Sequence, residues 1–376
     1  MSKTRIIVAA LMSLFIVVYL LVVPNMIRDQ IGRDPYSEWM QPDESEYKGV
    51  ITVWHIVEFK PYLGSITTWL KERAKKIEDA DFGVYIDVLG MTTDEYAERV
   101  QNGERADVYS FPAGLFSSEI LMPMTEHPNV DFVSASLYRS GVYNNELLAL
   151  PYLYSGYGLM INMDILSRLG ESIPKEGVDV SFIAEGANRF DHYTGKNKKN
   201  HVYGLVGKNT LAAMLNITCD LGEAERFSSG NAAMHICDLR AIGDMERKNS
   251  AGKGINMNYY PISGYTDLVQ YIGIAADISD QKVPYVLSYI SELFTERSQL
   301  SLTELGIFPA VVLSEALTFE MEAAQRVYDG NKSPDVMNTF LFNAARHRVN
   351  DYAEAVLLGE VGAYESYIRL IESLRA

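Results

Sequence analysis

LLALPYLYSGYGLMINMDIL, residues 147–166, is the stretch that decides the fold of this chain. Two apolar runs, residues 147–150 and 159–161, flank a centre with one proline, three tyrosines and two glycines. This order predicts a strand, a crossing and a second strand. A helix is expected directly afterwards, because Asn162 can cap its start and Gly170 is placed to end it in the left-handed conformation. A hinge beside a ligand cleft and an ordinary turn with core tyrosines both fit this pattern.

Upstream of this segment, strand and helix patterns alternate. Residues 51–55 (ITVWH) predict a short buried strand, and the apolar residues between positions 66 and 77 recur on one face of a helix. Residues 84–88 predict the next strand, a capping box beginning at Thr92 predicts the next helix, and residues 106–111 predict a third strand. Such alternation implies a parallel sheet with helices on both faces.

A second set of short strands is predicted downstream, near residues 203–206, 232–236, 255–260 and 268–275. From residue 283 the pattern is helical. We therefore predict an α/β chain with two lobes. Residues 48–152 together with 277–376 form the first lobe and its C-terminal helices, and residues 153–276 form a reduced second lobe.

The N-terminal residues predict a membrane anchor. Residues 6–23 are uncharged and almost wholly apolar, and they follow Lys3 and Arg5. At about 1.5 Å per residue this run just spans a hydrocarbon core. A cleaved signal peptide is the alternative, but no A-x-A site and no lipid-bearing cysteine follow. We favour an uncleaved anchor over residues 1–27, with the basic residues inside and the globular part held outside the cytoplasm, at the cell membrane.

Charge and composition exclude several classes of function. Residues 28–47, with two prolines and six acidic residues, predict a solvated linker. The chain carries 33 Lys and Arg against 49 Asp and Glu, a net charge of -16, and such a surface repels nucleic acid and anionic lipid. Cys219 and Cys237 are the two cysteines, and either one disulfide or two free thiols is compatible with them.

Motifs of catalysis and metal binding are missing from the sequence. The six histidines are scattered, and there is no H-E-x-x-H, G-x-S-x-G, P-loop or G-x-G-x-x-G sequence. Tyr259 and Tyr260 are adjacent, but neighbouring side chains of a strand point to opposite faces, which makes a shared metal site difficult. We therefore expect no enzyme activity, no catalytic residue, no cofactor and no metal.

Five segments, in this order and spacing, resemble the family 1 extracellular solute-binding proteins, the maltose-binding-like receptors of ABC importers. They are ITVWH with the helix that follows it, ADVYSFPAGLF (106–116), LLALPYLYSGYGLMINMDILSRLG (147–170), FSSGNAAM (227–234) and the run 279–310. The resemblance implies a periplasmic-binding-protein-like fold with two α/β lobes joined by hinge-crossing strands. It also implies that a solute is enclosed between the lobes by hinge closure and delivered to ABC permease subunits in the membrane.

The same resemblance implies a set of cleft residues. Sugar-binding members use aromatic rings against pyranose faces and carboxylates or amides for hydroxyls. Two of these contacts match at Glu58 and Phe111, whereas Ser155 replaces a glutamate and Arg240 replaces a stacking tryptophan. Gly114 and Leu115 replace an Asp-Arg pair, so maltodextrin is not the expected solute. The candidate ligand-binding residues are Trp54, Glu58, Phe111, Tyr154, Ser155, Tyr157, Asp238 and Arg240.

Some of these residues have a second interpretation. Trp54 lies inside a strand and fits the core, and Arg240 fits either a solvated helix face or a fork for an acidic ligand. Relatives also carry a longer insert between Gly204 and Phe227.

We predict a monomeric, extracytoplasmic carbohydrate-binding component of an ABC importer that acts by non-covalent capture. The alternatives are a degenerate receptor-like interaction or sensing protein, and a glycosidase-like enzyme with two carboxylates facing one cleft.

Overall fold

The computed structural model describes residues 47–57, 59–124, 133–174, 178–194, 200–206, 223–262, 266–314, 316–332 and 334–341, with positions 365, 368, 369 and 372. The predicted anchor and all but the last residue of the predicted linker lie outside these ranges. Within them, no helix combines the length and the apolar character needed to cross a membrane. Residues Gly49–Ala376 form one compact unit, and it contains two large sheets.

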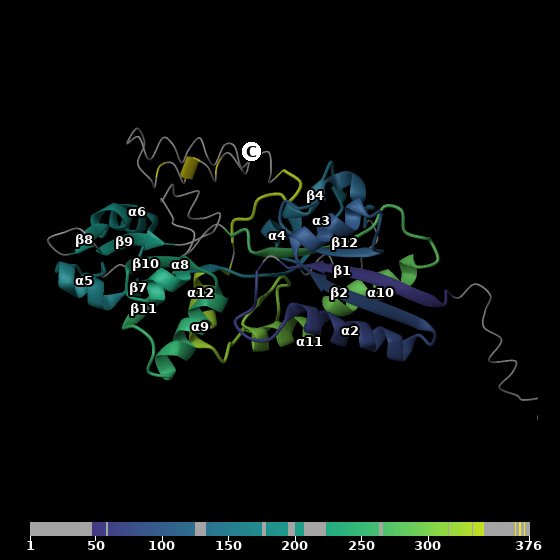
Figure 1. Cartoon of the computed structure of the whole chain (residues 1–376). Helices are drawn as coiled ribbons and strands as arrows, with labels where there is room; N and C mark the ends of the chain where they lie inside the picture. Colours follow the sequence, from purple (N-terminus) through teal and green to yellow (C-terminus); the bar gives the residue numbers. More distant parts are fainter. Residues whose placement is uncertain are drawn as a thin grey trace, which may run out of the picture. The chain divides into compact units, whose positions relative to one another are not determined.

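The first sheet has six strands in the order β13-β6-β12-β3-β1-β2. β1 runs parallel to both β2 and β3, as the alternating pattern predicted, whereas β12 is antiparallel to β3 and β6. The strands are β1 (Gly49–Ile56), β2 (Val84–Met91), β3 (Val108–Pro112), β6 (Leu150–Tyr154), β12 (Val269–Ile274) and β13 (Phe308–Pro309). A short hairpin of β4 (Val142–Tyr143) and β5 (Glu146–Leu147) lies beside this sheet (Figure 1).

Helices cover both faces of the first sheet. Figure 1 shows α2, α10 and α11 on one face and α3 and α4 on the other. α2 begins at the cap Ser65 and buries its apolar stripe, including Trp69 and Leu70, and the capping box at Thr92 starts α3. The helices are α2 (Ile66–Ala80), α3 (Thr93–Gln101), α4 (Ala135–Ser140), α10 (Val283–Leu293) and α11 (Glu296–Leu300), with 3₁₀ turns η1 (Ser118–Ile120) and η3 (Ser301–Leu305).

The second sheet has five strands in the order β11-β7-β10-β9-β8. They are β7 (Tyr157–Asn162), β8 (His192–Thr194), β9 (Asn200–Val206), β10 (Ala232–Cys237) and β11 (Met257–Ile262). Its helices are α5 (Met163–Leu169), α6 (Val180–Arg189), α8 (Glu223–Ser228), α9 (Leu239–Ser250) and α12 (Glu322–Gly330), the last packing on β11 and α9. We call the first sheet with its helices the first lobe, and the second sheet with its helices the second lobe.

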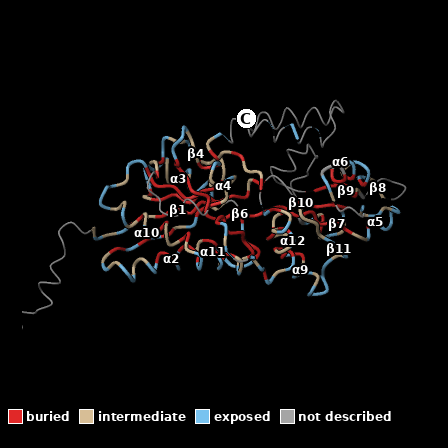
Figure 2. Tube along the Cα trace, turned by 180° about the vertical axis from the view of Figure 1, so that it is seen from behind, coloured by how far each residue is buried: buried red, intermediate tan, exposed pale blue. Residues whose placement is uncertain are grey.

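The segment 147–166 forms the predicted strand, crossing, strand and helix. Every residue of β6 and β7 is buried, and Figure 2 shows buried chain along both strands. The side chain of Asn162 accepts hydrogen bonds from the amides of Asp164 and Ile165 at the start of α5, and Gly170 ends the helix at φ 72°. The crossing interpretation is therefore confirmed over the ordinary turn.

The sequence pattern placed residues 268–275 in the second strand set, and the structure corrects this. β12 lies between β3 and β6 in the first sheet. All six of its residues are buried, which is what a central strand of either sheet requires. The sequence of a short apolar strand does not indicate which strand it pairs with. The prediction therefore rested on the position of residues 268–275 along the chain, and that position did not identify the correct sheet. The return from the second sheet to the first therefore precedes residue 269, not residue 277.

A row of buried polar side chains crosses four strands of the first sheet. His55 Nδ1 lies 2.8 Å from Ser110 Oγ, which in turn lies 2.9 Å from the hydroxyl of Tyr152. Gln270 Nε2 donates to Ser110 Oγ at 3.1 Å and to the carbonyl of Ile56 at 3.0 Å. Burial lowers the pKa of His55 to about 3. The imidazole is therefore neutral in the folded protein, and the row fixes the strands relative to one another.

We expect the stability of the protein to fall with acidification from pH 6.5 downward. Burial lowers the pKa of His55 to about 3 and that of His235 to about 4, whereas the unfolded chain binds these protons near 6.5. The stabilisation is complete above pH 6.5 and is lost as the pH falls toward the folded pKa values. Between pH 6.5 and 5 each histidine should cost about 1.6 kcal/mol, measured by urea unfolding.

The variant His235→Gln is the control for this pH dependence. It removes one of the two titrating groups, so the loss between pH 6.5 and 5 should shrink by about half. An unchanged pH slope in this variant would show that other groups cause the acid sensitivity.

Candidate functional site

In the crossing from β6 to β7, both backbone polar groups of Ser155 form hydrogen bonds. Its amide donates to the carbonyl of Leu268 at 2.8 Å, and its carbonyl accepts from Thr266 Oγ1 at 2.8 Å. Thr266 is fully buried, and its hydroxyl oxygen also accepts from the amide of Leu268. The outgoing and returning connections between the two sheets are therefore tied to each other at Ser155.

The two tyrosines around Ser155 are engaged within the crossing. The hydroxyl of Tyr154 donates to the carbonyl of Asn331 at 3.2 Å, and the hydroxyl of Tyr157 donates to the carboxylate of Asp267. Asn331 also donates to the carbonyl of Ile262 at 3.1 Å, at the end of β11. Both tyrosines are buried, and burial raises the pKa of Tyr154 well above its usual value. The crossing is thus a packed, hydrogen-bonded joint.

Trp54 and Phe111 lie in the aromatic core of the first lobe. Trp54 meets Tyr96 and Tyr109 edge-on, with ring centroids 6.2 and 6.0 Å apart. The centroid of Phe111 lies 4.4 Å from that of Phe116. Both side chains are buried, so neither ring is open to a solute in this arrangement.

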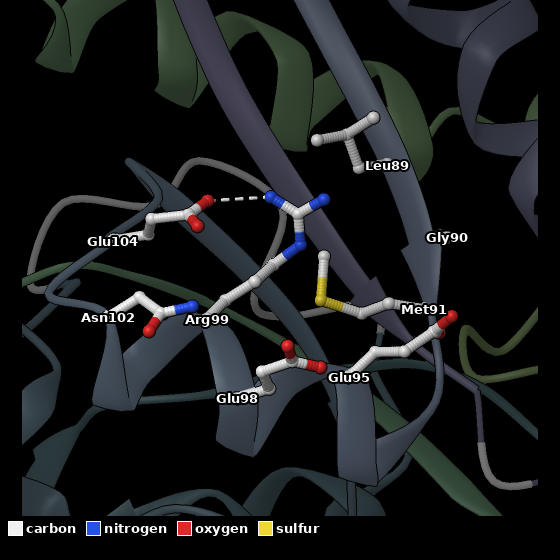
Figure 3. Close-up of a pocket in the computed structure, with 8 residues that line it drawn as sticks. All are labelled: Leu89, Gly90, Met91, Glu95, Glu98, Arg99, Asn102 and Glu104. Carbon is white, nitrogen blue, oxygen red and sulfur yellow. Dashed lines mark hydrogen bonds and ion pairs between the residues drawn. The ribbon is translucent and has the colours of Figure 1, made fainter.

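A polar pocket of about 360 Å³ lies between β2 and α3 (Figure 3). Its lining includes Glu98 and Arg99, and Arg99 pairs with Glu104 at 2.6 Å. The guanidinium of Arg99 also lies 5.8 Å from the ring centroid of Trp54. Glu95, on the same wall, already accepts hydrogen bonds from Thr92 at the helix start. The pocket is thus a surface hollow whose charges are largely paired.

The other two candidates, Asp238 and Arg240, lie together at the start of α9. The carboxylate of Asp238 caps this helix by accepting from the amide of Ala241 at 2.9 Å, and burial raises its pKa above the usual value. Arg240 Nη1 donates to the carbonyl of Tyr62 at 3.4 Å, and its Nε lies 3.6 Å from Asp244. Arg240 therefore connects the second lobe to the segment that follows β1 in the first.

Tyr62 is the residue of this region that sequence reasoning missed. Its hydroxyl donates to Glu246 Oε2 at 2.5 Å, and the guanidinium of Arg247 lies 5.7 Å from its ring centroid. Burial, followed by the hydrogen bond to Glu246, raises the pKa of Tyr62 to about 12. The available sequence signal was Gly243, because a glycine inside a helical pattern often marks a close approach.

Tyr259 of β11 belongs to the same neighbourhood. Burial and the negative charge of Glu246 raise its pKa to about 12, and the guanidinium of Arg326 lies 5.3 Å from its ring centroid. Its neighbour Tyr260 occupies the next register position, opposite Leu159 of β7. The chain thus gathers two phenols, a carboxylate and guanidinium groups around α9, which we call the α9 site: Tyr62, Arg240, Glu246, Arg247 and Tyr259.

The structure gives only part of the answer for three further expectations from the sequence: the contact at Glu58, the state of the two cysteines and the absence of a metal site. Glu58 and Cys219 lie outside the described residues. Cys237 is buried, and its sulfur donates to the carbonyl of Gly158 at 3.6 Å. Across the described ranges, no three His, Cys, Asp or Glu side chains come together as metal ligands.

Comparisons with solved structures define the fold. Matches include the GacH receptor of Streptomyces glaucescens (14% identity, 88% of this chain, 98% of that chain, TM-score 0.54). A family 1 extracellular solute-binding protein from Bifidobacterium longum subsp. infantis matches at 12% identity, 86% and 98% coverage and TM-score 0.57. The maltose/maltodextrin-binding domain MalE from Bdellovibrio bacteriovorus matches at 14%, 86% and 99%, and 0.54. No family model and no curated protein matches the sequence.

These matches show that the chain has the α/β, periplasmic-binding-protein-like fold of the family 1 extracellular solute-binding proteins. The resemblance carried by the five sequence segments is thereby confirmed. The matched proteins are binding proteins and not enzymes.

We expect Thr266→Val to loosen the joint at Ser155. The change keeps the side-chain shape but removes the hydroxyl that donates to the carbonyl of Ser155 and accepts from Leu268. Leaving these buried groups unpaired should lower the free energy of unfolding by about 1–3 kcal/mol, measured by urea unfolding. Thr68→Val, at an exposed position of α2, is the matched control and should change stability by less than about 0.5 kcal/mol. Equal effects of the two changes would contradict the role of Thr266.

Proposed function

We propose that this protein is an extracytoplasmic solute-binding component of an ABC importer and that it binds a carbohydrate between its two lobes. The observation that carries the proposal is the pair of sheets joined by the crossing at Ser155, in a fold shared with carbohydrate receptors. The GacH receptor was solved with acarbose, the MalE domain with maltotriose, and a Listeria monocytogenes substrate-binding protein with cycloalternan. Hinge closure around the solute is the mechanism that such a joint permits.

The α9 site has the chemistry that sugar recognition needs. A carboxylate such as Glu246 accepts hydrogen bonds from sugar hydroxyls, and a guanidinium such as that of Arg240 donates to ring and hydroxyl oxygens. The ring of Tyr259 offers an apolar face to the C–H surface of a pyranose. We therefore assign solute contact first to Arg240, Glu246, Arg247 and Tyr259 of the α9 site, with Asp238 fixing the helix start. Glu58, Tyr154, Ser155 and Tyr157 remain predictions, and the burial of Trp54 and Phe111 favours their core interpretation.

Membrane attachment and transport form part of the same proposal. Residues 1–27 would tether the globular part outside the cytoplasm, and a monomer would hand its solute to permease subunits. Edman sequencing of the mature protein is the direct measurement, with an N-terminus before residue 6 expected. A mature N-terminus after residue 23 would replace the anchor with a cleaved signal.

A receptor-like interaction or sensing protein without transport is the second candidate. The contact of Tyr62 with α9 favours this second candidate, because Glu246 and Arg240 already have hydrogen-bond partners within the protein when no solute is bound. The panel of ligands below separates the two functions.

We expect an oligosaccharide to stabilise the full chain in mild detergent. A ligand at 100 times its dissociation constant should add about 2.7 kcal/mol to the free energy of unfolding, seen as a thermal shift. The panel should hold maltotriose, cycloalternan, chitin oligosaccharides, xylan oligosaccharides and acidic sugars. Arg240→Gln should weaken binding about 10-fold or more, because it removes a charged donor. Arg168→Gln, on the exposed face of α5, is the matched control. No shift with any sugar, in a folded sample, would favour the interaction protein.

A further inference from the structure

Tyr62 contacts the second lobe through its hydroxyl, its ring and its backbone carbonyl. It belongs to the segment between β1 and α2 of the first lobe, yet its hydroxyl donates to Glu246 and its carbonyl accepts from Arg240, both on α9 of the second lobe. Arg247, also on α9, lies over its ring. Only 9% of the surface of this large residue is exposed. One residue of the first lobe therefore satisfies three polar side chains of one helix in the second.

Two glycines make room for this ring, one from each lobe. A Cβ atom on Gly243, in the middle of α9, would lie 2.7 Å from a ring carbon of Tyr62. A Cβ atom on Gly306, which has φ +69°, would lie 2.7 Å from the Cβ of Tyr62. Glycine inside a helix is less stable than alanine, so the approach of the ring accounts for a residue that helix formation disfavours.

The charges on α9 are also paired with one another, independently of Tyr62. Asp244 lies 3.6 Å from Arg240 Nε and 2.5 Å from Arg247 Nη2, and it thereby positions both guanidinium groups. Glu246 is left facing the phenol of Tyr62. A phenol hydroxyl and a sugar hydroxyl are equivalent donors to a carboxylate, and a flat ring covers Gly243 as the face of a pyranose would.

We propose that Tyr62 is a displaceable latch: without a solute it holds the first lobe against α9, and a solute hydroxyl takes its place on Glu246. The displacement part of this inference rests on the proposed function, whereas the latch itself does not. Solute binding then competes with an internal contact, and the apparent affinity is reduced by the fraction of molecules that are latched.

The latch predicts a change in the separation of the lobes without any solute. Spin labels at Lys71→Cys, on the exposed side of α2, and Ser229→Cys, after α8, in a Cys219→Ser background report the distance between the lobes by double electron–electron resonance. Tyr62→Phe removes only the hydroxyl, and the loss of a hydrogen bond to a charged acceptor should raise the ratio of open to latched molecules about 10-fold. Tyr85→Phe, an exposed tyrosine in β2, is the matched control and should change nothing.

Gly243→Ala tests the same contact from the other lobe. The new Cβ displaces the ring, so the lobes should separate although the helix itself becomes more stable. Distance distributions that match the parent protein in both Tyr62→Phe and Gly243→Ala would overturn the latch.

Sugar binding, tested with maltotriose and the other sugars of the panel, separates the latch from the proposed function. If both hold, Tyr62→Phe should bind the effective sugar up to about 10-fold more tightly, and Glu246→Gln should bind it more weakly. Open lobes with no binding of any sugar would keep the latch and remove the carbohydrate function. Binding with unchanged affinity and unchanged distances would keep the function and remove the latch.

Discussion

The hydrogen bonds at Ser155 are the constraint on which the rest of the structure depends. The amide of Ser155 holds Leu268, and its carbonyl is held by Thr266, so the strand leaving the first sheet is tied to the strand returning to it. Because these groups are buried, they cannot exchange their partners for water without a large cost. Asn331 extends the joint by linking Tyr154 to the end of β11. The connection between the two sheets is therefore fixed by buried hydrogen bonds at this point.

The sequence predicts local structure well where the signal is local. Asn162 and Gly170 bound α5 as expected because capping depends on neighbouring backbone groups, and the Thr92 capping box starts α3 for the same reason. The place of β12 was not predictable in this way, since a buried strand has the same pattern in either sheet. Residue pattern shows that a segment is buried, and the partner against which it is buried depends on the whole chain.

In the candidate site too, the residues placed by local sequence were predicted and those placed by tertiary contacts were not. Trp54 and Phe111 have the residue types of sugar contacts, but the structure places both in the core, where aromatic residues serve equally well. Asp238 and Arg240 are brought to one helix start, as a strand followed by a helix implies. Tyr62 was missed because its partners lie about 180 positions away and no spacing links them. Such a contact arises from tertiary structure alone, and a glycine inside α9 was its only local trace.

The position of α12 has a consequence for the order in which the protein is made. This helix follows the last strand of the first lobe, yet it packs on β11 and α9 of the second. Each lobe is therefore assembled from separate stretches of chain, and the second lobe lacks one of its walls until residue 330 has left the ribosome. Domains usually fold as units during synthesis, N-terminal first. Here the surface of β11 and α9 that α12 covers is complete at residue 262 and stays uncovered until residue 330 has followed, so it is exposed to aggregation during that interval.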